Sequence, residues 1–181
     1  MEDNKSKLIL DSEVQIQERV IQIDRVNKVV SGGKRMSFRA VVISGNLNGS
    51  AGIGLGKSKE VPISIKKAVE RAKRSFVAIN ILNGTLPHAV DGKYGASRVI
   101  IKPARPGTGV IAGGSVRILL ELLGFKDVVA KSMGSNNSVN SARAALNALK
   151  KCKNIEAESK LRGKVFKLRH FNSLLSSAGD R

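Results

Sequence analysis

Runs of β-branched residues dominate the first third of the chain and predict three strands. Residues 20–30 are rich in valine and isoleucine, and residues 38–43 repeat this composition. Between them, residues 31–35 include two adjacent glycines and predict a loop. Residues 46–49 end in Asn-Gly, which accepts a positive φ and therefore predicts a hairpin turn. The third strand is expected over residues 51–55.

The third strand carries a glycine at every second position. Successive side chains of a strand point to opposite faces, so Gly52, Gly54 and Gly56 leave one face bare. Ala51, Ile53 and Leu55 fall on the other face. A face without side chains is useful where another element approaches closely. We therefore predict tight packing of backbone or RNA against these glycines.

A helical period follows the glycine strand and predicts a long helix from about Glu60 to Asn80. Pro62 suits its first turn, where a missing N–H costs nothing. The first unit is thus predicted as three strands and one helix. The apolar positions at helical spacing are Ile65, Val69, Ala72, Phe76 and Ile79.

The second half predicts the order strand, strand, helix, strand, helix. Asn83-Gly84 marks the junction between the halves. From Arg98 to Lys102, basic and apolar residues alternate as in a strand with one covered face. A helix is expected over residues 114–123, with Gly124 as its stop, and a strand over residues 128–131.

Asn137 is a good N-cap for the last predicted helix. The pattern places Val139, Ala142, Leu146 and Leu149 on its inward side. Together these elements predict an α+β protein of two small domains. The predicted divisions are an N-terminal extension of residues 1–13, domains of residues 14–80 and 81–165, and a C-terminal extension of residues 166–181.

Net charge narrows the class of partner. The chain has 181 residues, with 32 Lys and Arg against 14 Asp and Glu, a formal charge of +18. The surplus is spread over both halves, since residues 14–80 hold 13 bases and 4 acids and residues 81–151 hold 10 and 3. Nucleic acid is the first candidate partner and an anionic membrane surface the second.

Composition excludes several alternatives. Aromatic residues make up only 3% of the chain, too few for stacking single-stranded bases, so a helical nucleic acid held through its phosphates is favoured. No apolar run approaches the length of a membrane span. A single cysteine, Cys152, excludes an intramolecular disulfide and a cysteine-rich zinc site. The acidic first residues resemble neither a signal nor a transit peptide, and we expect an intracellular protein.

Two glycine-rich segments invite a phosphate-binding interpretation. Residues 51–58 lack the glycine that a phosphate loop needs five residues before its Gly-Lys-Ser. Residues 106–115 precede a helix, whose free N–H groups favour anions, but their spacing is not the dinucleotide fingerprint. For this second segment, contact with an RNA phosphate or another protein and a purely structural turn both stay open.

Basic residues gather at two places in the first unit. The loop of residues 31–35 fits insertion into RNA, because glycines let the backbone approach phosphate, although a solvated hairpin tip stays open. One side of the predicted helix is basic, including Arg71, with only Glu70 as a nearby acid. The predicted RNA-binding residues are Ser31, Gly32, Gly33, Lys34, Arg35, Arg39, Lys57, Lys66, Lys67, Lys73 and Arg74.

The sequence shows no recognisable set of catalytic residues. His88 and His170 lie far apart, and Asp91, Glu121 and Asp127 form no recognisable pair. Cys152 stands among lysines that could lower the pKa of its thiol, but no partner base is evident, so a structural or exposed thiol is favoured. We therefore expect no enzyme, no metal, no cofactor and no small-molecule substrate.

Several long motifs follow one another in order along the chain, over residues 29–35, 37–42, 52–61, 102–117, 130–140 and 162–164. Together they resemble the family of bacterial-type small-subunit ribosomal protein five. The resemblance covers about residues 14–164 and looks closest to cyanobacterial and plastid members.

The resemblance implies a first domain like a double-stranded-RNA-binding domain and a second βαβ domain with a left-handed crossover. It implies a ribosomal protein of the bacterial cytoplasm or plastid stroma. In that family the protein binds small-subunit rRNA between body and head, near the channel through which mRNA enters. It also contacts small-subunit proteins four and eight. By position, Ser31 to Arg35 would reach the neck, and Gly109 and Arg117 would lie at the contact with protein four.

The expected function is therefore structural: positioning rRNA and supporting decoding accuracy. Two rivals from other classes remain open at this level. One is a phosphotransferase that uses the glycine-rich segments, and the absence of an acidic metal site argues against it. The other is a free-standing regulator that binds double-stranded RNA.

Overall fold

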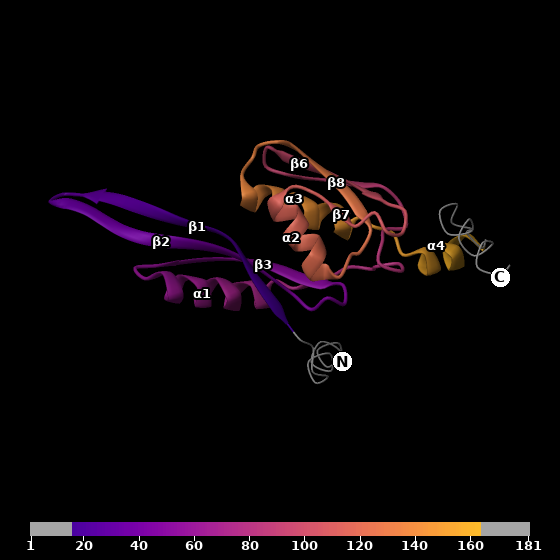
Figure 1. Cartoon of the computed structure of the whole chain (residues 1–181), viewed down its shortest axis with the longest axis horizontal. Helices are drawn as coiled ribbons and strands as arrows, with labels where there is room; N and C mark the ends of the chain where they lie inside the picture. Colours follow the sequence, from indigo (N-terminus) through magenta and orange to yellow (C-terminus); the bar gives the residue numbers. More distant parts are fainter. Residues whose placement is uncertain (1–15, 164–181) are drawn as a thin grey trace. The chain divides into compact units, whose positions relative to one another are not determined.

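Each half of the chain forms its own four-stranded sheet in the computed structural model, which describes residues 16–163 (Figure 1). Four described helices accompany the sheets, so the architecture is α+β, as predicted. The predicted extensions, residues 1–13 and 166–181, lie outside the described residues. The structure divides into a first unit of residues 16–78 with 118–124 and a second unit of residues 79–117 with 125–163.

The first sheet is antiparallel, in the order β1-β2-β3-β4. β2 pairs with β3 only from Phe38 onward, so residues 26–37 form a two-stranded arm made by β1 and β2 alone. Figure 1 shows this arm extending beyond the end of helix α1 (Val61–Arg74). The strands are β1 (Gln17–Val30), β2 (Gly33–Gly45), β3 (Ser50–Ser58) and β4 (Val77–Ala78).

The predicted loop of residues 31–35 is wrong in extent. Gly33 pairs with Val30, so only Ser31 and Gly32 form the turn, and Lys34 and Arg35 belong to β2. Gly32 has a φ of 93°, a left-handed value that glycine adopts without strain. All three predicted strands are longer than the pattern indicated, because pairing continues through polar residues.

Helix α1 packs against the bare glycine face of β3, which confirms the predicted close approach. A Cβ atom added to Gly54 would lie 1.9 Å from the carbonyl oxygen of Ala68, and one on Gly52 would lie 2.1 Å from that of Ala72. One on Gly56 would lie 2.0 Å from the carbonyl oxygen of Ser64. The partner of the glycines is therefore the backbone of α1, and small helix residues make this approach possible.

Helix α1 ends six residues earlier than the apolar period predicted. The Ser75 N–H donates to the Ala72 carbonyl at 3.0 Å, and its hydroxyl donates to the carbonyls of Ala72 and Ile53. The next residues, Val77 and Ala78, pair with β3 as the unpredicted strand β4. Side-chain and strand hydrogen bonds thus replace the last predicted turns of helix.

The predicted hairpin turn between β2 and β3 is confirmed. Asn46 Oδ1 accepts from the amides of Asn48 and Ser50 at 2.9 and 2.8 Å, and Gly49 has a φ of 87°. Leu47 also adopts a positive φ, 58°, which is unfavourable for a residue with a side chain. Its N–H donates to the Leu122 carbonyl at 3.0 Å, a bond that holds this conformation.

The second sheet has the order β5-β6-β8-β7. β5, β6 and β8 are antiparallel neighbours, whereas β7 runs parallel to β8. Helix α2 (Gly114–Leu123) connects β7 to β8 along the chain and completes the expected βαβ unit. The two-residue strand β7 was not predicted. The strands are β5 (Val90–Tyr94), β6 (Ser97–Pro103), β7 (Val110–Ile111) and β8 (Val128–Gly134).

Helix α3 (Ser138–Lys150) covers one face of the second sheet by the device used in the first. A Cβ atom on Gly92 of β5 would lie 2.3 Å from the Ala144 carbonyl oxygen and 2.4 Å from the Ala148 nitrogen. This close approach was not predicted, because Gly92 is the only glycine of β5 and forms no repeating pattern. Val90, Val99, Ile101, Leu146 and Leu149 are buried in this unit.

The last helix, α4 (Ile155–Arg162), was not predicted. Glu158 forms ion pairs with Lys153 at 3.0 Å and Arg162 at 2.9 Å. Lys153, and after it Arg162, hold the pKa of the Glu158 carboxyl below its ordinary value. No helix in residues 16–163 is long and apolar enough to cross a membrane.

Asn137 caps α3 as predicted, because its Oδ1 accepts from the Val139 amide at 3.0 Å. We expect Asn137→Ala to lower the free energy of unfolding by about 1 kcal/mol, since an N-cap substitution leaves an orphan N–H. Urea unfolding followed by circular dichroism measures this change. Asn136→Ala removes a neighbouring exposed amide and is the control. Equal stability of the two variants would show that the cap contributes nothing.

Candidate nucleic-acid interface

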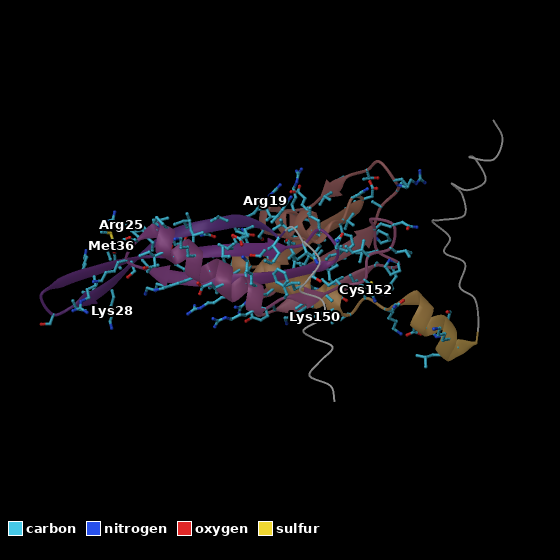
Figure 2. The ribbon with its side chains drawn as sticks, turned by 90° about the horizontal axis from the view of Figure 1, so that it is seen from below. Arg19, Arg25, Lys28, Met36, Lys150 and Cys152 are labelled. Atoms are coloured by element: carbon cyan, nitrogen blue, oxygen red, sulfur yellow. The ribbon has the colours of Figure 1, made fainter. Side chains whose placement is uncertain are left out.

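The arm concentrates positive charge without acids. No Asp or Glu occurs from Arg25 to Phe38. Lys28 lies directly opposite Arg35 across the two strands, an arrangement of like charges that is destabilising by itself. Figure 2 shows Lys28, Arg25 and Met36 on this part of the hairpin, where Arg25 Nε donates to Met36 Sδ. An anion bound at the arm would relieve the repulsion.

The turn at the tip of the arm is open. Added Cβ atoms on Gly32 and Gly33 would meet nothing within 4 Å. Ser31, Lys34 and Arg35 are all exposed. Because these two glycines carry no side chains and two cations follow them, a phosphate could approach the backbone of the turn closely.

Arg39 and Lys57 face each other at the base of the arm, but Arg39 already has an acidic partner. Its Nη2 lies 2.6 Å from Asp24 Oδ2, and Gln22 donates to the other oxygen of the same carboxylate. The hydrogen bond from Arg39, followed by that from Gln22, holds the pKa of Asp24 below its ordinary value. Arg39 is therefore partly neutralised, whereas Lys57 is exposed.

The outer side of α1 carries the second group of predicted cations. Lys66, Lys67 and Arg74 are exposed, and within residues 16–163 no acid lies in ion-pair distance of them. Lys73 differs, because its Nζ lies 2.9 Å from Glu18. Arg71 also differs, since its Nη1 donates to the Leu55 carbonyl at 2.7 Å and ties the helix to β3. Three of the predicted residues thus form an unbalanced basic face, the α1 face (Lys66, Lys67 and Arg74).

The predicted protein-contact residues belong to the second unit, whereas the groups described above belong to the first. Gly109 has a φ of 76°, so a side chain there would strain the backbone although space is open. Its N–H donates to Asp127 Oδ1 at 2.9 Å, and the Thr85 hydroxyl donates to the Asp127 carbonyl at 2.7 Å. Asp127, which sequence reasoning left without a role, therefore anchors the glycine-rich loop. Arg117 is exposed in the first turn of α2.

The candidates for catalysis have structural partners. His88 Nε2 accepts from the Lys153 N–H at 3.2 Å, so Nδ1 carries the proton and donates to the Ala89 carbonyl at 2.9 Å. Asp91 pairs with Arg98, and Glu121 pairs with Arg19. Residues 16–163 contain no group of three His, Cys, Asp or Glu that could hold a metal ion. His170 lies outside the described residues.

Cys152 fits the favoured interpretation of a structural thiol. The residue is half-buried, and burial raises the pKa of its thiol above the ordinary value. Figure 2 labels Cys152 just beyond Lys150. Burial therefore disfavours the thiolate, which is the nucleophilic form.

Two family descriptions match most of the chain. Residues 16–80 match "Ribosomal protein S5, N-terminal domain", and residues 92–162 match "Ribosomal protein S5, C-terminal domain". Among curated relatives, small ribosomal subunit protein uS5 of Thermotoga maritima is 49% identical over 82% of this chain and 83% of its own length. Protein uS5c of Rhodomonas salina is 49% identical over 88% of this chain and 95% of its own. Protein uS5c of Guillardia theta is 52% identical over 80% and 86%.

Proposed function

The chain belongs to the ribosomal protein S5 family, whose members are structural, non-enzymatic proteins of the small ribosomal subunit, and from this premise we propose how it binds there. Family membership places it on ribosomes of the bacterial cytoplasm or plastid stroma and associates it with rRNA. We propose that its site on the rRNA lies between body and head, near the channel through which mRNA enters. Residues 14–80 and 81–165 are its two proposed domains.

The observation that carries the proposal is unbalanced positive charge on two surfaces of the first unit. The arm presents Lys28, Lys34 and Arg35 without an acid, and the α1 face presents three more cations. A charge surplus of this kind repels itself until an anion neutralises it. The two surfaces would bind rRNA phosphates, with the glycine turn at the tip of the arm reaching closest to the RNA.

Sedimentation tests the function directly. The tagged full chain, expressed in a bacterial host, is expected to travel with small subunits through a sucrose gradient at physiological magnesium. Its release by high salt would accompany loss of the electrostatic contacts. A chain that stays at the top of the gradient at every salt concentration would instead support a free-standing RNA-binding regulator.

The second unit is proposed to contact small-subunit proteins four and eight, with Gly109 and Arg117 facing protein four. Gly109 has a left-handed φ that glycine adopts without strain, whereas a side chain there would strain the loop. Arg117 carries a cation near the positive end of the α2 dipole, where it does not stabilise the helix. Arginine also suits a planar contact with a carboxylate of a partner protein. These features support a role in recognition at this loop and helix.

We expect Arg117→Leu to leave the isolated protein folded and able to bind rRNA, but to raise miscoding by ribosomes that carry it. The reason is loss of the proposed contact with protein four. A stop-codon readthrough reporter measures accuracy, and circular dichroism checks the fold. Lys150→Leu removes one exposed cation from α3 and is the matched control. Wild-type accuracy in ribosomes fully occupied by the Arg117 variant would contradict the proposed contact.

A further inference from the structure

The second sheet has a face that α3 does not cover, and half of its side chains are basic. Residues of β5, β6 and β8 alternate between a buried side under α3 and an exposed side. The exposed side, called the open face, includes four cations, one acid and three apolar residues. They are Lys93, Arg98, Lys102, Lys131, Asp91, Ile100, Val129 and Met133.

Strand register brings these residues together although they come from three segments of sequence. Lys93 lies directly opposite Arg98, and Arg98 lies directly opposite Met133. Lys102 lies opposite Val129, two residues along β8 from Lys131. With strands about 4.8 Å apart and residues rising about 3.3 Å, the four cations occupy an area of about 10 by 13 Å. The alternation of basic and apolar residues from Arg98 to Lys102 is visible in the sequence, and no part of the proposed function depends on it.

Within residues 16–163, acids do not balance the charge on the open face. Asp91 is the acid on this face, and its Oδ2 lies 3.1 Å from Arg98. Both side chains are more than half exposed, so this pair is weak. Lys93 faces Arg98 as a like charge across the strands, which disfavours the sheet unless an anion lies above it.

The chemistry of the face favours RNA over a protein partner. Three of its four cations are lysines, a residue type depleted in protein–protein interfaces, and none of its residues is aromatic. Tyr94, the aromatic residue of β5, pairs with Ser97 and lies on the other face of the sheet. Its hydroxyl oxygen accepts a hydrogen bond from Arg143 of α3. Without an aromatic platform, bases have nothing to stack on. The ligand is therefore a phosphate backbone.

We propose that the open face is a second rRNA-binding surface, which contacts the phosphate backbone of a structured segment through Lys93, Lys102 and Lys131. This inference rests on the proposed function, since the rRNA of the small subunit supplies the anion. It differs from that function in location, because every RNA-binding residue predicted from the sequence lies in the first unit. Val129 and Met133 would support the aliphatic stems of the lysines, whose charged ends then reach outward.

Salt-dependent binding of the full chain to small-subunit rRNA tests this surface. The K102Q/K131Q variant is expected to lower the slope of log affinity against log salt by roughly 1.5, since each phosphate contact contributes about 0.7–0.9. The K102R/K131R variant keeps both charges and is expected to bind like the wild type. The matched control K126Q/K150Q removes two exposed lysines of the same unit that lie off the open face.

Several outcomes would overturn the inference. An unchanged slope for K102Q/K131Q, or an equal loss in K126Q/K150Q, would show that the open face has no specific role. Unchanged rRNA binding with lost retention of another small-subunit protein would make the face a protein interface. If only the α1 face variant described below lost affinity, this inference would fail and the proposed function would stand. A wild-type chain that binds no rRNA would overturn both.

Discussion

Replacing Gly54 by valine is expected to unfold the first unit. The Cβ atom alone would lie 1.9 Å from the Ala68 carbonyl oxygen and 2.5 Å from the Ala72 nitrogen. Both are backbone atoms of α1, so no side-chain rotation can relieve the overlap. The helix would have to move away from the sheet and expose the cluster of Ala40, Val42 and Ala68. We expect the free energy of unfolding to fall by more than about 4 kcal/mol, as it does for the most severe single substitutions.

That loss is comparable with the whole stability of a domain, about 5–15 kcal/mol. Urea unfolding of the purified chain, followed by circular dichroism and by proteolysis of the first unit, measures it. Gly52→Val is expected to act in the same direction, since its Cβ would lie 2.1 Å from the Ala72 carbonyl oxygen. Gly114→Ala is the control, because a Cβ there would meet nothing within 4 Å. Wild-type unfolding of Gly54→Val would mean that α1 does not sit on the glycine face.

Removing the charges of the α1 face is expected to weaken rRNA binding more than any other surface change proposed here. The K66Q/K67Q/R74Q variant deletes three exposed cations that have no acidic partner within residues 16–163. If each contacts one phosphate, the slope of log affinity against log salt falls by roughly 2–3. Affinity for unrelated RNA duplexes should fall equally, because phosphate contacts carry no sequence information.

Filter binding of the full chain to small-subunit rRNA between low and physiological salt measures this slope. The control K126Q/K150Q/K160Q removes the same number of exposed cations from the second unit. A slope equal to that of the wild type would remove α1 from the RNA interface. A loss confined to one RNA sequence would replace phosphate contact by base recognition.

Local sequence determined the features that depend on single residues and their immediate neighbours. Asn137 caps α3 and Asn46 closes the β2–β3 turn. In each case the side-chain oxygen accepts hydrogen bonds from backbone N–H groups only a few residues away. The side-chain-free face of β3 could be predicted for a similar reason. Because side chains alternate along a strand, three glycines at every second position fall on one face. The basic excess also needs no structure to be seen, and it pointed to nucleic acid.

Tertiary structure decided where elements end. The apolar period of α1 continues through Phe76 in the sequence. The helix nevertheless ends before it, because the Ser75 hydroxyl donates a hydrogen bond to the Ile53 carbonyl and Val77 pairs with β3. A helical period cannot reveal that a strand edge is available to pair with the chain. In the same way, the register of the hairpin, and not the glycines alone, assigned Lys34 to a strand.

Tertiary structure also decided which charges are free to act and which surfaces exist. In the sequence, Arg39 and Lys73 cannot be distinguished from the other exposed cations near them. In the fold, Arg39 forms an ion pair with Asp24 and Lys73 forms one with Glu18, both acids of β1. Cys152 lies among lysines, yet packing withdraws its thiol from water and raises the pKa of that thiol. The cations of the open face come from the consecutive strands β5 and β6 and from β8, about 30 residues further along the chain, and only strand register gathers them. Composition determines how much charge the protein carries, whereas pairing across the fold determines where that charge remains unbalanced.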